Sequence, residues 1–206
     1  DLRNPMTVIS GYTQLMVMDD DLLQRQNRCE KDLRQVDDMS AMIGDLLAYA
    51  RGDSKLRPGE VELKALASDL HEQLKAQCES RGIKLQIEAV TATVLLDMGR
   101  LKRILFNLAK NAIDVISKGD LLNISIKPER LGVALTIRDS GPGLPPEVLS
   151  RLFQPFVSTG KRQGTGLGLS IVKRFVDDHQ GSITVQSTPK EGTTFFVYLP
   201  SVVQGP

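Results

Sequence analysis

The stretch of the sequence best suited to hold a ligand is a glycine-dense turn that runs directly into an expected helix. The turn consists of Gly164, Thr165, Gly166, Leu167 and Gly168. Because glycine has no Cβ, this backbone can take positive φ and bring its N–H groups close to a ligand. The N-terminus of the helix expected over 170–178 carries a partial positive charge, which favours an anion. The pattern therefore predicts a phosphate site, with a plain flexible connector as the alternative.

The helix expected over 98–116 carries a second group of polar side chains. They share one face at helical spacing, opposite the apolar positions, and comprise Asn107, Lys110, Asn111 and Asp114. Asparagine is a mediocre helix former, so two of them one turn apart are an unusual choice for a merely solvated face. Their carbonyl oxygens suit Mg²⁺ and their amides suit phosphates, while Lys110 adds a positive charge. An ordinary polar face is the alternative.

An acidic residue followed by glycines comes directly after the strand expected over 133–137. This segment holds Asp139, Gly141 and Gly143. The carboxylate could accept a hydrogen bond from an exocyclic amino group, which distinguishes adenine from guanine; a plain turn is the alternative. A polar, basic loop that contains Lys161 leads into the glycine turn and is predicted to be a mobile lid.

Two regions with different sequence patterns must position these residues. Residues 4–51 are expected to form two helices, whose near-heptad pattern predicts a hairpin that pairs with a second copy into a four-helix bundle. Packing of these helices on the rest of the same chain is the alternative. After a boundary at 52–59, helices and antiparallel-looking strands predict one sheet covered by helices on one side, an α/β sandwich. The fold class is thus α+β, with helices over 63–80 and 98–116 and strands over 83–87, 122–126, 133–137, 183–185 and 195–199.

Composition narrows the function classes. Among 206 residues, 26 Lys and Arg against 25 Asp and Glu give a net charge of +1, which argues against nucleic acid as a partner. Cys29 and Cys78 lack metal-ligand spacing and are expected to be free thiols of a cytoplasmic protein. No apolar run reaches membrane-spanning length, so this chain is expected to make no membrane contact. It begins at Asp1 without a methionine, which indicates a segment of a longer protein that could carry a membrane anchor upstream.

Five motifs in a fixed order make the pattern more specific. In chain order they are Asn107-x-x-x-Asn111, Asp139-x-Gly141-x-Gly143, Phe153-x-Pro155-Phe156, Gly164-x-Gly166-x-Gly168 and Gly192-Thr193. This order resembles the catalytic core of a sensor histidine kinase of two-component systems, with its Bergerat-type ATP-binding domain. Asn111-Ala112-Ile113-Asp114 is closer to the nitrogen-regulation-type kinases than to those with a basic residue at position 114.

The resemblance implies ATP and Mg²⁺ as ligands. Asn111 and Asn107 would serve the metal and the phosphates, and Asp139 would bind the adenine amino group with Thr193 nearby. The implied nucleotide-binding set is Asn107, Lys110, Asn111, Asp139, Gly141, Gly143, Lys161, Gly164, Thr165, Gly166, Leu167, Gly168 and Thr193. Related ATPases place a water-activating glutamate one turn before the metal asparagine, where this chain has Asn107. Transfer to a side chain is therefore favoured over hydrolysis.

Residues 1–55 resemble the family's dimerisation and phosphotransfer hairpin, and 60–201 its ATP-binding domain. The family's phosphoacceptor motif reads His-Glu/Asp-x-x-Asn/Thr-Pro, and the chain from Asp1 to Pro5 matches every position but the first. The histidine would lie immediately before Asp1, so this chain alone is expected not to autophosphorylate. By resemblance, Asp1 would orient the histidine or accept its proton. Asn4 would position water for dephosphorylation of a response regulator.

The partners implied by the resemblance are a second copy of the chain and a response-regulator receiver domain. The two histidines within the chain are poor substitutes as acceptors, since His71 is expected on a helix surface and His179 at a helix end. Two alternatives stay open. One is a regulatory, chaperone-like or ATPase module of the same fold without histidine transfer, and the other is a catalytically incomplete structural piece.

Overall fold

The chain divides into two compact units, Asp1–Asp53 with Gln163–Thr165 and Ser54–Arg162 with Gly166–Pro206. The computed structural model describes residues 13, 29, 36, 55–155, 157 and 166–201. Thr13, Cys29 and Val36 are each helical. Apart from these three positions, the predicted hairpin lies outside the described residues, as do Asp1 and Asn4, so the hairpin stays a prediction.

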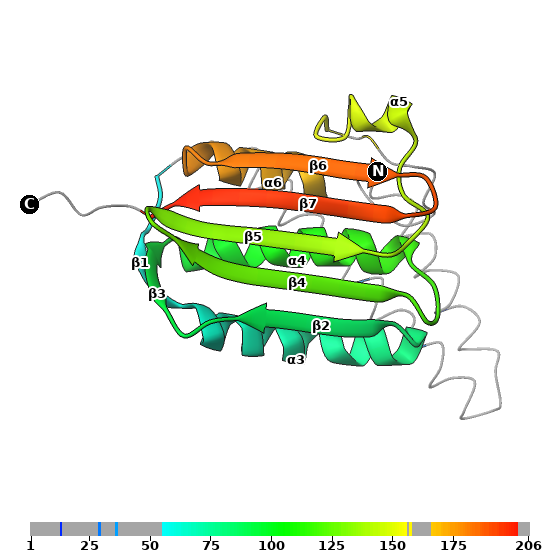
Figure 1. Cartoon of the computed structure of the whole chain (residues 1–206), viewed down its shortest axis with the longest axis horizontal. Helices are drawn as coiled ribbons and strands as arrows, with labels where there is room; N and C mark the ends of the chain where they lie inside the picture. Colours follow the sequence, from blue (N-terminus) through cyan, green and yellow to red (C-terminus); the bar gives the residue numbers. More distant parts are fainter. Residues whose placement is uncertain are drawn as a thin grey trace, which may run out of the picture. The chain divides into compact units, whose positions relative to one another are not determined.

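The second unit is built on a five-stranded mixed sheet in the order β2-β4-β5-β7-β6 (Figure 1). Its strands are β2 (Lys84–Ala89), β4 (Leu121–Glu129), β5 (Gly132–Asp139), β6 (Ser182–Thr188) and β7 (Gly192–Pro200). β4 and β5 form a hairpin, and β7 pairs antiparallel with both β5 and β6. β2 pairs parallel with β4, which corrects the expected antiparallel arrangement. The chain crosses from β2 to β4 through helix α4 (Met98–Val115), and such a crossover returns it in the same direction.

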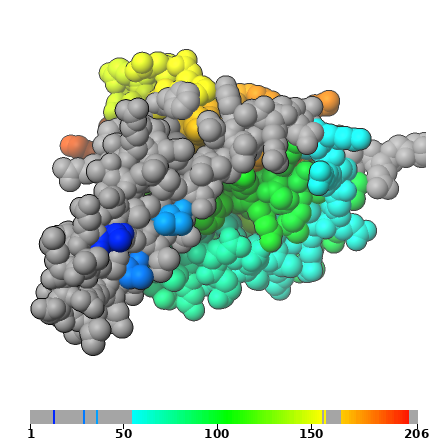
Figure 2. Space-filling model, turned by 180° about the vertical axis from the view of Figure 1, so that it is seen from behind, coloured from blue at the N-terminus to red at the C-terminus, as the bar shows by residue number. Residues whose placement is uncertain are grey.

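Helices cover one face of this sheet. They are α3 (Leu63–Arg81), α4 and α6 (Gly168–Asp178), while α5 (Pro146–Leu149) is a single turn (Figure 1). Figure 2 shows α3 (teal) and α4 (green) side by side on this face. Alternate residues of β4 (Leu122, Ile124 and Ile126) are fully buried, because successive strand side chains point to opposite faces. The predicted α+β class, with one sheet covered on one side, is confirmed for this unit.

A second, two-stranded sheet was not predicted. β1 (Gly59–Glu62) pairs antiparallel with β3 (Thr93–Leu96). Both strands have four residues, which is too short for a clear alternation of polar and apolar positions. The sheet is tied to the rest of the unit because the Ser201 hydroxyl donates to the carbonyl of Leu95 (3.2 Å) and accepts from its N–H (3.1 Å). Among the described residues, none of the helices is long and apolar enough for a bilayer crossing.

The two thiols of the chain differ sharply in exposure. Cys78 lies on the buried side of α3 with 1% of its surface exposed, and burial raises the pKa of its thiol. Cys29 is exposed. Because the thiolate is the reactive species, Cys29 is expected to react with a disulfide reagent at neutral pH, whereas Cys78 should react only after unfolding. A thiol count before and after denaturant measures this, and two fast thiols in the native protein would contradict it.

Candidate functional site

Asp139 ends the central strand β5 with its carboxylate locked by backbone donors. Its Oδ1 accepts hydrogen bonds from the N–H of Gly141 (2.9 Å) and the N–H of Thr193 (3.3 Å). Asp139 and Thr193 are also partners in the β5–β7 register. The side chain is 4% exposed, so these bonds to a buried charged group fix the plane of the carboxylate.

The turn after Asp139 requires glycine at position 141, because there is no room for a side chain. A Cβ on Gly141 would lie 2.7 Å from Cγ2 of Ile116 and 2.9 Å from Oδ1 of Asp139. Ile116 follows the last turn of α4 and is 1% exposed. The guanidinium of Arg81 donates to the carbonyls of Ile113 (2.5 Å) and Ile116 (3.3 Å), where helix carbonyls lack intrahelical partners. The apolar side chain of Ile116 and the Asp139 carboxylate therefore both lie beside Gly141.

Two further glycines allow close backbone approaches around this turn. Gly143 has φ +70°, and a Cβ there would lie 2.2 Å from the carbonyl oxygen of Thr188. Gly192 has φ +100°, and a Cβ there would lie 2.0 Å from the carbonyl oxygen of Asp139. Both values lie in the left-handed region that favours glycine. These two positions hold the β6–β7 turn against the segment that follows Asp139.

Ser187 on β6 joins these pieces, and no pattern in the sequence pointed to it. Its hydroxyl donates to the carbonyl of Gly192 (3.0 Å) and accepts from the N–H of Leu144 (2.8 Å). Since that proton is used, the Thr193 hydroxyl, 3.0 Å away, is the donor to Ser187. One serine thus ties the Thr193 side chain to both neighbouring loops.

The second cluster lies where α6 begins against α4. A Cβ on Gly168 would lie 3.9 Å from Cγ of Asn107, 4.0 Å from its Oδ1 and 4.0 Å from Nδ2 of Asn111. The structure therefore brings together both asparagines and the last glycine of the predicted phosphate turn. The Nδ2 atom of Asn107 is buried and has no hydrogen-bond partner among the described residues. Because a buried donor is costly to leave unpaired, it fits an oxygen-rich ligand such as a phosphate.

The start of α6 holds one residue of the predicted nucleotide-binding set that belongs to the core. Gly166 has φ +67°. Leu167 is 3% exposed, and its carbonyl accepts from the N–H of Ile171 (3.0 Å) and from the Ser170 hydroxyl (2.8 Å). Leu167 therefore anchors the helix start. Its side chain is part of the hydrophobic core, so the structure gives this residue a packing role.

Of the remaining residues in the predicted nucleotide-binding set, one lies on α4 and the others lie in segments that the structure does not describe. Lys110 lies on α4 between the two asparagines and is half-buried. Lys161, Gly164 and Thr165 lie outside the described residues. The structure thus assembles two clusters, one around Asp139 and one around Asn107.

Helix α4 links the two clusters. Ile116 follows Asn111 by five residues, or about 7 to 8 Å along a helix axis at 1.5 Å per residue. An elongated ligand with a planar amino-bearing ring at one end and a polyanion at the other would meet both clusters at once. An adenine nucleotide has this chemistry.

Comparisons with known proteins agree with the motifs. Residues 96–203 match the family model described as histidine kinase-, DNA gyrase B- and HSP90-like ATPase, and residues 1–55 match the His Kinase A (phospho-acceptor) domain. Sporulation kinase A of Bacillus subtilis (strain 168) is 30% identical over 202 residues, which are 97% of this chain and 33% of that protein. The chain thus spans about a third of the length of this curated relative.

Solved structures give the same picture. The nucleotide-free catalytic domain of histidine kinase ThkA is 28% identical, with a TM-score of 0.63 over 70% of this chain and 96% of that one. Full-length ShkA in complex with AMPPNP is 26% identical, with a TM-score of 0.75 over 99% of this chain and 44% of that one. Since the ATPase model alone covers more than half of the 206 residues, the chain belongs to the histidine kinase-, DNA gyrase B- and HSP90-like ATPases, in the form of a sensor histidine kinase catalytic core.

Proposed function

We propose that this catalytic core binds Mg-ATP and transfers the γ-phosphate to a histidine of the N-terminal region, from which it passes to an aspartate of a response regulator. The observation that carries the proposal is the pair of clusters along α4. Asp139, held by the Gly141 and Thr193 amides, suits adenine, and Asn107 beside Gly168 suits phosphate. The structure of ShkA in complex with AMPPNP supports a nucleotide at this fold.

Each residue then has a chemical role. The Asp139 carboxylate accepts a hydrogen bond from the adenine amino group, and Ile116 covers the ring. The Asn107 amide donates to phosphate oxygens. Asn111 supplies an amide oxygen to Mg²⁺, a ligand type that this hard cation prefers. When bound, Mg²⁺ neutralises phosphate charge, which leaves phosphoryl transfer to positioning and electrostatics.

The acceptor side of the proposal rests on the N-terminal match. Residues 1–55 would form the dimerising phosphotransfer hairpin of a homodimer and 60–201 the ATP-binding domain of a cytoplasmic catalytic core, of the nitrogen-regulation type. We infer that the acceptor histidine immediately precedes Asp1 in the parent protein, because Asp1 to Pro5 continue the family's acceptor motif. Asp1 would then assist transfer, and Asn4 would assist dephosphorylation of the response regulator. The buried His179, 3% exposed, is not accessible to a phosphate donor.

An ATPase module of the same fold is the second candidate. The structure places an amide, Asn107, against the start of α6, and an amide has no useful basicity for activating water. This observation favours transfer to a side chain over hydrolysis.

Incubation with γ-labelled ATP and Mg²⁺ tests the proposal with three proteins. They are this chain, the chain with one histidine added before Asp1, and the added-histidine chain carrying Asn111→Asp. Acid-labile label is expected in the two proteins with the added histidine and not in this chain. In the third, a carboxylate replaces an amide beside the phosphates, and the labelling rate is expected to fall about tenfold or more.

Each outcome decides between the candidates. Steady phosphate release by all three proteins without protein labelling would favour the ATPase. Equal labelling with and without the added histidine would place the acceptor elsewhere. Undiminished labelling in the Asn111→Asp protein would remove Asn111 from the proposed metal site.

A further inference from the structure

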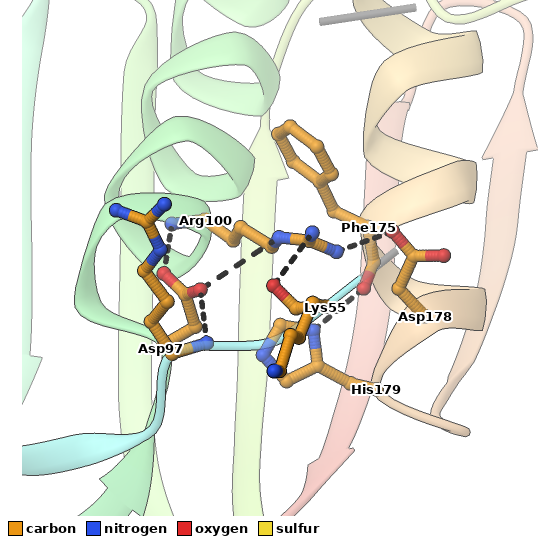
Figure 3. A network of polar contacts seen from close by, with 7 residues as sticks. Lys55, Asp97, Arg100, Phe175, Asp178 and His179 are labelled. Atoms are coloured by element: carbon orange, nitrogen blue, oxygen red, sulfur yellow. Dashed lines mark hydrogen bonds and ion pairs between the residues drawn. The ribbon is translucent and has the colours of Figure 1, made fainter. Parts of the chain in front are cut away.

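The segment that leads into the ATP-binding unit is held by charged side chains at one end of the helix layer. We define the linker as Lys55–Pro58, directly before β1. The N–H of Arg57 donates to Oδ2 of Asp97 (2.9 Å), and Nη2 of Arg100 donates to the carbonyl of Lys55 (3.5 Å). Figure 3 shows Arg100 between Asp97, Asp178 and the Lys55 carbonyl.

Arg100 also reaches the last turn of α6. Its guanidinium pairs with the Asp178 carboxylate, and its carbon Cζ lies 5.2 Å from the centroid of the Phe175 ring. Its Nε lies 3.7 Å from Oδ2 of Asp97, the residue whose Oδ1 caps α4 by accepting the Arg100 N–H (3.1 Å). The Arg100 and Asp178 side chains are 12% and 14% exposed, so this pair is largely shielded from solvent.

Two other ion pairs that involve these helices are much more exposed. Lys102 with Asp69 and Lys173 with Asp177 are more than 40% exposed at every side chain. Neither pair involves the linker, and exposed pairs contribute little to stability. They provide matched controls on α4 and on α6 for any effect of the Arg100 pair.

The Arg100 pair and the cluster around Asn107 lie at opposite ends of α6, and both contact α4. Near the start of α4, Arg100 meets the end of α6, and about two turns later Asn107 meets the start of α6 at Gly168. The helices therefore run antiparallel, and the eleven residues of α6 separate the two contacts by about 15 Å. His179 closes the far end by a hydrogen bond between its Nδ1 and the Phe175 carbonyl (2.6 Å). Helix α6 thus connects the contact at Arg100 with the contact at Asn107.

We propose that Arg100 is a positioning residue that couples the linker to the nucleotide end of α6. The inference rests on the proposed nucleotide site at Asn107 and Gly168. By linkage, a nucleotide that fixes the start of α6 strengthens the grip of Arg100 on Lys55, and a linker held in place favours nucleotide binding to the same degree. Lys55 is the last residue of the segment that matches the phosphoacceptor domain, so the linker connects that segment along the chain to the unit that holds the proposed ATP site.

Trypsin cleavage after Lys55 measures the coupling, because the Lys55 carbonyl that Arg100 holds belongs to the cleaved bond. In the full chain, Mg-ADP is expected to slow formation of the fragment that begins at Leu56 by about fivefold or more. Arg100→Ala is expected to raise cleavage without nucleotide by about tenfold, because cleavage follows the population of the open linker. It should also reduce the protection by Mg-ADP to less than about twofold. Mass spectrometry identifies the fragment, and calorimetry measures ADP binding by the same samples.

The controls keep the inference separate from the proposed function. Lys102→Ala and Lys173→Ala should behave as the unaltered chain. If the unaltered chain does not bind ADP, the proposed function itself is wrong. Normal ADP binding with no protection at Lys55, or full protection in Arg100→Ala, would overturn the coupling. If Arg100→Ala fails to melt cooperatively, Asp178→Asn, which keeps the side-chain shape and removes the ion pair, decides between the same outcomes.

Discussion

Replacement of Asp139 by asparagine is expected to lower ADP affinity by about tenfold to 100-fold while the protein stays folded. Asparagine keeps an Oδ1 that can accept from the N–H groups of Gly141 and Thr193, so the local backbone is retained. The second oxygen becomes an amide donor, which opposes the adenine amino group. Hydrogen bonds to charged groups contribute about 1.5 to 3 kcal/mol, which gives the expected range. Isothermal titration with ADP measures the loss.

Asp69→Asn is the matched control for this prediction. Asp69 is a half-exposed carboxylate on α3, where its hydrogen bond from Lys102 lowers its pKa. ADP affinity should be unchanged in this variant. Unaltered ADP affinity in Asp139→Asn would remove Asp139 from the adenine site, and an unaltered preference for ADP over GDP would remove it from base selection.

Replacement of Gly141 by alanine is expected to abolish measurable ADP binding and to lower the melting temperature by several degrees. The added methyl would lie 2.7 Å from Ile116 Cγ2 and 2.9 Å from Asp139 Oδ1, so the Ile116 side chain and the carboxylate must move apart. Overpacking of this kind costs about 1 to 3 kcal/mol. In a protein of this size each kcal/mol lowers the melting temperature by about 2 to 4 °C.

Two other glycines isolate the cause of this loss. Gly59 has no atom within 4 Å of an added Cβ, so Gly59→Ala should alter neither stability nor ADP binding. Gly119 also has open space but φ +94°, so Gly119→Ala should cost stability through backbone strain and leave ADP binding intact. ADP binding by Gly141→Ala at the level of the unaltered chain would show that the adenine pocket lies elsewhere.

Local patterns in the sequence were sufficient for the elements that carry the site. The amphipathic repeat of α4 predicted that Asn107 and Asn111 share a face, because helix geometry fixes that relation within one turn. The β4–β5 hairpin was also predictable, since its strands are close in sequence. That Asp139 meets Thr193 followed only from the family resemblance, because the β5–β7 register joins residues 54 positions apart.

The polar contacts between distant elements left no local signal. Arg100 and Asp178 lie 78 positions apart, and Leu144 and Ser187 lie 43 apart. Each of these residues alone resembles an ordinary surface position, because its partner comes from another element. Strands β1 and β3 were not predicted for a related reason. Val61 and Leu96 are buried by residues from other elements, and a strand of four residues is too short to show a pattern of buried positions.

Helix α3 has a consequence for how the domain can be trimmed. The matched ATPase segment begins at residue 96, downstream of β1, α3 and β2. Yet α3 buries six residues against the sheet and α4: Leu63, Leu66, Ala67, Leu70, Leu74 and Cys78. Four buried leucines at about 1.5 to 3 kcal/mol each match the whole stability of a typical domain. The folding unit therefore includes α3, and a truncation at the edge of the family match would leave an exposed apolar surface where α3 had been.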